Sequence, residues 1–244
     1  MKRLLTAMTM MAAFALTAPA AANQAEIDAI YAMFAERSAG MRPDSVQPSP
    51  VAGLYEVVIG SSVIYMSGDA RYVLQGRMID TDNGRDLTEP AARSGRLAAL
   101  ATVPESEMII FEPEGEVLHT LTTFTDIDCP YCRRMHAEMP QLNAAGIRVR
   151  YMLYPRAGIG SAAHTKAVNV WCAEDRGDAL TRAKLGEKLP TGSCETPIGN
   201  HMELAQALGL TGTPMNITDT GEVISGYAPA PQMIQQLAMS KAAN

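Results

Sequence analysis

The chain has 244 residues, 47% of them hydrophobic, and carries a formal net charge of −6 at pH 7. The hydrophobic fraction is typical of a globular protein with a substantial core, and the length allows one large domain or two small ones. The acidic balance argues against nucleic acid as a partner.

Residues 1–22 are predicted to be a secretory signal peptide. Two basic residues open it, residues 4–16 are apolar but too short to span a bilayer comfortably, and three alanines precede cleavage after Ala22. Cleavage after Ala20 and an uncleaved anchor helix are the alternatives. The signal has a bacterial form and no lipid-attachment cysteine follows it. We therefore expect a soluble protein of the periplasm, with no membrane insertion once the signal is removed.

Residues 23–85 are predicted to form a small α+β domain. An amphipathic helix over 24–38 precedes short strand-like runs separated by glycine-containing turns, at 53–59, 62–66, 70–75 and 77–80. A sheet of this size buries too little surface to be comfortable alone and has edges that must be covered. Dimerisation through an edge would meet both needs, and packing on the rest of the chain is the alternative.

Residues 86–103 are predicted to be a linker helix, and residues 104–244 a larger α/β domain. Strands are expected at 108–111 and 117–126, then a helix from Arg133 to Leu142 and a strand at 147–154. The remaining predicted elements are helices at 161–174, 178–186 and 198–209, strands at 215–218 and 222–225, and a last helix at 231–238. This order is that of a thioredoxin-like core with a helical insertion.

Cys129 and Cys132 form a CxxC motif between a predicted buried strand and a predicted helix. The free N–H groups and the dipole of a helix N-terminus stabilise a thiolate. Such a thiolate can attack a disulfide, and the second cysteine can resolve the product. Half of a zinc site has the same spacing, but no second close Cys/His pair accompanies this one, so the pattern favours redox chemistry over zinc or a static disulfide.

The four cysteines of the chain allow three pairings. Pairing Cys129 with Cys132 and Cys172 with Cys194 is favoured, because two close thiols form one chemical unit. The periplasm permits disulfides, and the second bridge would then join two helical segments. A regulatory or metal-binding role for Cys172 and Cys194 is the alternative.

Several segments together resemble the periplasmic disulfide isomerases of the DsbC/DsbG family. They are the runs at 47–54, 74–76, 124–132, 151–155, 170–172 and 208–214. The resemblance covers nearly all of the chain after the signal. It implies a V-shaped homodimer in which the N-terminal domains pair and the thioredoxin-like domains face a shared apolar cleft. It also implies that a DsbD-like membrane reductase keeps the protein reduced, and that no metal or organic cofactor is required.

The resemblance also assigns roles to single residues. Cys129 is implied to be the nucleophile and the more exposed sulfur, and Cys132 the resolving thiol. Thr213 and Pro214 match the cis-proline loop that offers backbone groups to an extended substrate. Cys172 and Cys194 match a structural disulfide of the DsbC branch. The expected substrates are misfolded, disulfide-containing exported proteins.

One feature departs from the DsbC branch. Pro130 and Tyr131 stand between the cysteines, where that branch usually has Gly-Tyr and the DsbG branch Pro-Tyr. The other motifs favour DsbC, so an isomerase or reductase is the leading hypothesis. A DsbA-like oxidase is the rival among enzymes. A holdase chaperone, or a copper carrier that uses the two thiols with nearby Met or His, is the rival among binding proteins.

Overall fold

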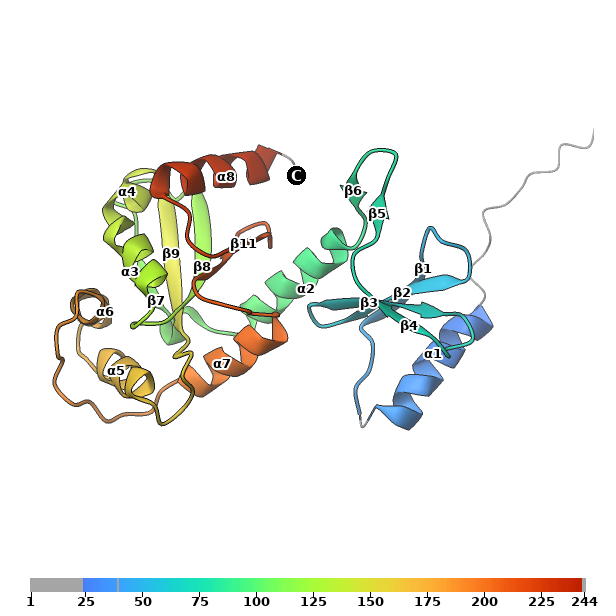
Figure 1. The fold of residues 1–244 in the computed structure, drawn as a ribbon, viewed down its shortest axis with the longest axis horizontal. Coiled ribbons are helices and arrows are strands. Elements are labelled where there is room, and N and C mark those ends of the chain that lie inside the picture. Colours follow the sequence, from blue (N-terminus) through green and yellow to red (C-terminus); the bar gives the residue numbers. More distant parts are fainter. Residues whose placement is uncertain (1–23, 39, 243–244) are drawn as a thin grey trace, which may run out of the picture.

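The computed structural model describes residues 24–38 and 40–242, and shows two folded units joined by a helix (Figure 1). The predicted signal peptide lies outside the described residues. Within the part of the chain that is described, no helix is both long and apolar enough to cross a membrane.

The first unit is a helix packed on a four-stranded antiparallel sheet. Helix α1 (Gln24–Arg37) precedes strands that pair in the order β1-β2-β3-β4. The strands are β1 (Ser45–Pro48), β2 (Leu54–Ile59), β3 (Ser62–Ser67) and β4 (Val73–Gln75). Ile30 and Phe34 of the helix pack on Val57 and Met66 of the sheet. Because β1 and β4 pair on one side only, both are edge strands.

Strand β1 is absent from the sequence prediction, which placed the first strand of this domain at 53–59. The structure pairs Pro48, the last residue of β1, with Tyr55 of β2. Proline cannot donate to a ladder, but at the end of an edge strand this loss is tolerated. Helix-breaking residues therefore concealed a strand.

Helix α2 (Glu89–Ala101) connects the units and begins three residues later than predicted. Asp86 instead lies in a hairpin of β5 (Ile79–Asp80) and β6 (Arg85–Asp86), where it pairs with Ile79. The helix packs closely on the first unit, since a Cβ added at Gly95 would lie 2.1 Å from the carbonyl oxygen of Gly60.

On its other side, α2 contacts the second unit. Arg96, which is 8% exposed, donates from Nε to the carbonyl oxygen of Gly221 at 2.6 Å. Arg93 also lies 3.6 Å from the Glu222 carboxylate. The connection is therefore a packed helix that touches both units rather than a free tether (Figure 1).

The second unit is a five-stranded sheet in the order β11-β10-β8-β9-β7, in which only β8 and β9 are parallel. The strands are β7 (Ile109–Phe111), β8 (His119–Thr125), β9 (Ile147–Leu153), β10 (Met215–Thr218) and β11 (Val223–Ser225). The helices are α3 (Pro130–Ala137), α4 (Met139–Ala144), α5 (Ala162–Trp171), α6 (Arg176–Lys184), α7 (Ile198–Ala207) and α8 (Ala230–Ala242).

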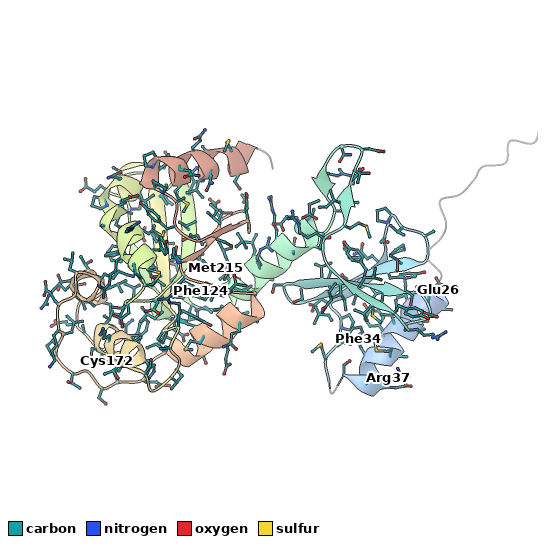
Figure 2. The ribbon with its side chains drawn as sticks, viewed as in Figure 1. Glu26, Phe34, Arg37, Phe124, Cys172 and Met215 are labelled. Atoms are coloured by element: carbon teal, nitrogen blue, oxygen red, sulfur yellow. A yellow bond between two sulfur atoms is a disulfide. The ribbon has the colours of Figure 1, made fainter. Side chains whose placement is uncertain are left out.

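Alternate residues of the central strands serve two cores. Leu121 of β8 belongs to a core with residues of α3, α4, α5, α6 and α8. Phe124 of the same strand packs with Met152, Met215 and residues of α7 and α2 on the other face. Figure 2 labels Phe124 and its cross-strand partner Met215, which lie together within this unit. The central strands are covered on both faces, which places the end of β8 deep in the domain.

The segment predicted as one helix from Arg133 to Leu142 is two helices in the structure. Helix α3 ends at Ala137, and α4 begins at Met139 after a break at Glu138. Pro140 has no N–H with which to continue the hydrogen-bond ladder of α3, so a new helix begins here. The break also frees the Glu138 carboxylate to accept from the Ala230 backbone N–H and the Tyr227 hydroxyl.

Candidate redox site

The two cysteines lie where β8 gives way to α3. Cys129 caps the N-terminus of α3, Cys132 lies in its first turn, and both are free thiols. Both residues are only 1% exposed, so Cys129 does not have the greater exposure that was expected. The reason is the neighbouring loop, whose Thr213 carbonyl oxygen accepts a hydrogen bond from the Cys129 thiol at 3.2 Å.

The pKa of Cys129 lies below its ordinary value. Burial alone would raise this pKa, but polar contacts with Thr213, with the backbone and side chain of Cys132 and with the backbone of Tyr131 outweigh the effect of burial. The backbone groups that lower this pKa belong to the first turn of α3, where N–H groups have no acceptor within the helix and are directed at the capping residue. The first cysteine of the motif is thus prepared to ionise.

The pKa of Cys132 moves the other way. Burial raises it, although the Lys184 ammonium, the Asp126 backbone and the Thr125 side chain each act to lower it. A pair of groups whose pKa values are driven apart can divide two chemical roles between them. The surroundings of the two cysteines therefore favour a thiolate at Cys129 and a protonated thiol at Cys132.

Thr213 and Pro214 face this motif from the loop before β10. The peptide bond between them is cis, and Thr213 is 7% exposed. The hydrogen bond from Cys129 brings this loop against the N-terminus of α3, although the two are separated by more than eighty residues. The structure thus brings together all four residues that the sequence singled out around the motif.

Two carboxylates lie near the motif, and a negative charge there opposes a thiolate unless other groups compensate it. Asp126 is 3% exposed and accepts from both the backbone N–H and the Nε of Arg156, each at 3.0 Å. Asp128 pairs with Arg133 at 3.2 Å and with Lys166 at 2.7 Å. Cationic partners therefore compensate both charges. Arg156 was not predicted to take part in the site, and its only signal in the sequence is its position directly after the Pro155 that ends a predicted strand.

An aromatic surface borders the motif. Tyr131, between the cysteines, is 56% exposed and stacks on Tyr227 with ring centroids 6.5 Å apart. The Tyr227 hydroxyl donates to Glu138 at 2.6 Å, and the guanidinium of Arg134 lies 5.7 Å from the Tyr131 ring centroid. A flat, partly apolar surface beside a reactive sulfur is suited to contact with unfolded chains.

His136 of α3 is 6% exposed and packs in the interior of the domain. Its ring nitrogens lie 3.3 Å from the Tyr151 hydroxyl and 2.9 Å from Thr181 Oγ1, and burial lowers its pKa to about 4. His201 is also buried, with its Nδ1 accepting from the Leu153 N–H. Among residues 24–38 and 40–242, no three His, Cys, Asp or Glu residues form a group able to hold a metal ion.

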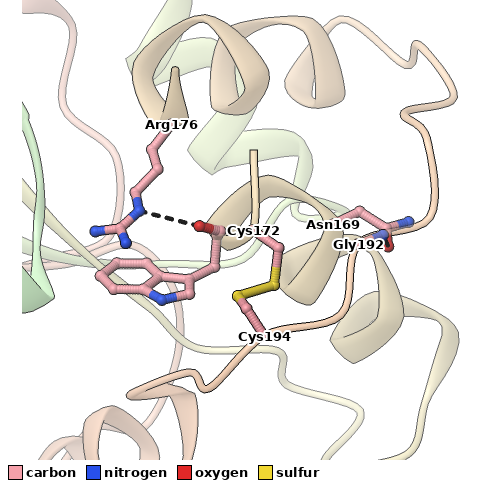
Figure 3. The surroundings of a disulfide bond; sticks show 6 residues. Asn169, Cys172, Arg176, Gly192 and Cys194 are labelled. Atoms are coloured by element: carbon pink, nitrogen blue, oxygen red, sulfur yellow. Dashed lines mark hydrogen bonds between the residues drawn. A yellow bond between two sulfur atoms is a disulfide. The ribbon is translucent and has the colours of Figure 1, made fainter. Parts of the chain in front are cut away.

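Cys172 and Cys194 form a disulfide that joins the end of α5 to the loop before α7 (Figure 3). The Asn169 side chain accepts from the Gly192 N–H at 2.9 Å and fixes the same loop. The Nε of Arg176 donates to the Trp171 carbonyl oxygen at 3.0 Å, and the Arg176 guanidinium lies 3.7 Å from the centroid of the Trp171 ring. The bridge therefore fastens the loop before α7 to the end of α5.

Replacing Cys172 and Cys194 together by serine should lower the free energy of unfolding by about 3 kcal/mol, because the unfolded chain loses a closed loop. Urea unfolding of the variant and the parent measures this difference. The reduced CxxC should still reduce disulfides under conditions where the variant is folded. Equal stability of variant and parent would contradict a structural role for the bridge.

A thiol pair at the start of a helix, placed by the central strand of a thioredoxin-like sheet and faced by a cis-proline loop, defines a thiol–disulfide oxidoreductase. Comparison with known protein families supports the same class of protein. Residues 17–89 match the disulfide bond isomerase protein N-terminal domain, and residues 104–241 match the thioredoxin-like domain. The α+β first domain and the thioredoxin-like second domain are therefore confirmed.

The curated relatives of the chain show which family of oxidoreductases it belongs to. The chain is 35% identical to the thiol:disulfide interchange protein DsbC of Escherichia coli K12, over 80% of each chain. It is also 35% identical to that of Dickeya dadantii, over 83% of this chain and 84% of the relative. A solved disulfide interchange protein from Neisseria gonorrhoeae is 29% identical, with a TM-score of 0.51 over 57% of this chain and 99% of that structure. The chain belongs to the DsbC family of thiol:disulfide interchange proteins.

Proposed function

We propose that this chain is a periplasmic disulfide isomerase and reductase that acts through a mixed disulfide at Cys129. The observation that carries the proposal is the opposite displacement of the two thiol pKa values, down at Cys129 and up at Cys132. The names of the curated relatives, which are thiol:disulfide interchange proteins, support the same class of reaction.

The reaction begins when the Cys129 thiolate attacks one sulfur of a wrong disulfide in the client. A bond forms between Cys129 and that sulfur, and the other client sulfur leaves as a thiolate. If a second client thiolate then attacks the client sulfur of the mixed disulfide, Cys129 leaves unchanged and the client has been isomerised. If Cys132 attacks Cys129 instead, the client leaves as a reduced dithiol and the enzyme is oxidised.

Two surfaces next to Cys129 would hold the client. The loop at Thr213 and Pro214 would pair with an extended client segment through its backbone, as a strand is added to a sheet edge. The stacked rings of Tyr131 and Tyr227 would receive apolar side chains of the same client. Neither surface demands a particular sequence, which fits an enzyme that must act on many misfolded proteins.

The active form is proposed to be a homodimer joined through the domain at residues 23–85, with residues 86–103 as the arm and 104–244 as the catalytic domain. Strand β4 is an edge strand, and its Val73 and Leu74 are 53% and 49% exposed. An edge strand with exposed apolar residues can pair with a strand of a second chain. A dimer would place two Cys129 sites around one client.

Removal of residues 1–22 would release the protein into the periplasm, where a DsbD-like membrane reductase would return Cys129 and Cys132 to dithiols. A disulfide oxidase is the second candidate, because Pro130 stands between the cysteines. Trapping free thiols in intact cells separates the two: reduced cysteines support the isomerase and oxidised cysteines the oxidase.

The direct test of the proposed activity is refolding of a scrambled protein with several disulfides. Catalytic amounts of the reduced chain should restore the native activity of the client faster than a small dithiol at the same thiol concentration. A protein that oxidises reduced clients but leaves scrambled ones scrambled would contradict the proposal.

A further inference from the structure

Lys184, the last residue of α6, is a buried cation that the family motifs do not include. It is 4% exposed and shares the inner face of its helix with Ala179, Leu180 and Ala183. A charged ammonium is costly in such a place unless charged or strongly polar groups compensate it. A buried lysine among core residues therefore calls for an explanation.

The hydrogen-bond partners of Lys184 are uncharged oxygens close to the redox motif. Its Nζ donates to Thr125 Oγ1 at 2.9 Å and to the Asp126 carbonyl oxygen at 3.4 Å, and lies 5.6 Å from the centroid of the Tyr151 ring. The Asp126 carboxylate is engaged by Arg156. Besides this carboxylate, the two thiols of the motif are nearby groups that can supply a full negative charge to Lys184.

Thr125 connects Lys184 to Cys132. It is the last residue of β8, it is 1% exposed, and its hydroxyl accepts a hydrogen bond from Lys184. The same side chain also acts to lower the pKa of the Cys132 thiol, so Thr125 interacts with both groups. A hydroxyl that can both donate and accept is able to pass a proton between its neighbours.

The charged and titratable groups around Lys184 come from several elements. Arg133 of α3 lowers its pKa, and the Asp126, Cys129 and Cys132 groups raise it. His136, on the same helix as Arg133, is neutral with a pKa of about 4, and the buried Tyr151 hydroxyl has a raised pKa. Burial is the largest influence, and the pKa of Lys184 falls to about 8. Its neutral amine is therefore accessible near neutral pH.

Lys184 also lines a cavity between α3, α4 and α6. The cavity has a volume of about 350 Å³ and is lined by Lys184 together with Arg133, His136, Thr181 and Leu185. Leu185 at its edge is 74% exposed. A proton taken up by Lys184 could leave by this side while a client covers Cys129.

We propose that Lys184 accepts the proton of Cys132, through the Thr125 hydroxyl, in the step that releases the client. This proposal rests on the roles proposed above for Cys129 and Cys132. In the mixed disulfide Cys129 no longer ionises, so Cys132 is the remaining thiol of the motif that faces Lys184. Lys184 acts through Thr125 and does not touch the client, which makes it a positioning and proton-accepting residue.

The Cys132 proton moves to the Thr125 oxygen while the Thr125 proton moves to the neutral Lys184 amine, which becomes an ammonium. The Cys132 thiolate then attacks the Cys129 sulfur, a disulfide forms between them, and the bond from Cys129 to the client sulfur breaks. The electron pair of that bond leaves with the client as a thiolate. Cys129 and Cys132 are oxidised, the client is reduced, and the net charge is unchanged.

Stopped-flow reaction of the reduced protein with the aromatic disulfide DTNB separates the two steps. Attack by Cys129 releases one coloured thiolate, and resolution by Cys132 releases the second. In Lys184→Met, the second release at neutral pH should slow by at least about 10-fold relative to the first, and the midpoint of its pH profile should rise by about one unit or more. A purely structural role for Lys184 would not move this midpoint.

Matched variants complete the test. Thr125→Val removes the hydroxyl with little change of shape and should slow the second release in the same way, whereas Thr125→Ser should keep it within about 3-fold of the parent. Lys188→Met removes an exposed lysine nearby and should leave both releases unchanged. Thr125→Val also provides the test if Lys184→Met does not fold.

A second release with parental rate and pH profile in Lys184→Met would overturn the proposal. A parental Thr125→Val beside a slow Lys184→Met would overturn the route through Thr125. Failure of the underlying function has a different signature, because a first release that persists at parental rate in Cys129→Ser would remove Cys129 as the nucleophile.

Discussion

Cys129→Ser is expected to lose isomerase and reductase activity completely, down to the rate of the small-molecule buffer. The serine hydroxyl does not ionise near neutral pH, so the contacts from Thr213 and the first turn of α3 no longer have a thiolate to stabilise. Refolding of a scrambled client measures the isomerase activity, and reduction of a simple protein disulfide measures the reductase activity.

Cys132→Ser is the matched control for this loss, since it removes the other thiol of the same motif. It should keep measurable isomerisation, because a client thiol can release Cys129, but it should lose catalytic reduction. The two variants should both remain folded, as each changes one sulfur to one oxygen. Undiminished isomerisation by Cys129→Ser would remove this residue from the mechanism.

The second large effect is expected at the edge of the N-terminal sheet. Val73→Lys combined with Leu74→Lys should convert the dimer to monomers, with a dissociation constant raised at least about 100-fold. Both side chains are about half exposed on β4, and a twofold axis at this edge would bring the new charges of two copies together. Light scattering at micromolar concentration measures the mass.

Dissociation of the dimer should impair isomerisation more than reduction. The monomer should still reduce simple disulfides, because the redox site lies wholly within the second unit, but it should isomerise scrambled clients poorly. Val51→Lys, which charges an equally exposed position outside the strands, is the control and should remain dimeric. A monomeric parent, or a double variant that stays dimeric, would contradict the proposed interface.

The sequence predicted the order of elements in the second domain because its signals are local. Alternating apolar residues mark β9, and Gly146 and Pro155 mark its two ends. The CxxC could be placed at a helix N-terminus for the same reason. Local signals failed where two patterns conflicted. Prolines concealed β1, and the apolar periodicity that continues past Ala137 concealed the break between α3 and α4.

The electrostatic surroundings of the site could not be predicted, because they depend on contacts between distant segments. Arg156 reaches Asp126 across thirty residues, and Lys184 reaches Thr125 across fifty-nine. A weak signal for Lys184 existed, since it follows Ala179, Leu180 and Ala183 on the apolar face of its helix. The equal burial of Cys129 and Cys132 was also missed, as it depends on the loop at Thr213.

The most direct test of the proposed chemistry is to trap the mixed disulfide itself. Cys132→Ser should accumulate a covalent complex with a scrambled client, because the thiol that would resolve it is missing. Mass spectrometry of peptides from this complex identifies the cysteine that carries the client. The account predicts a client peptide joined to Cys129, with the disulfide between Cys172 and Cys194 intact. A complex joined through Cys172 or Cys194, or no covalent complex with a client that the parent isomerises, would contradict it.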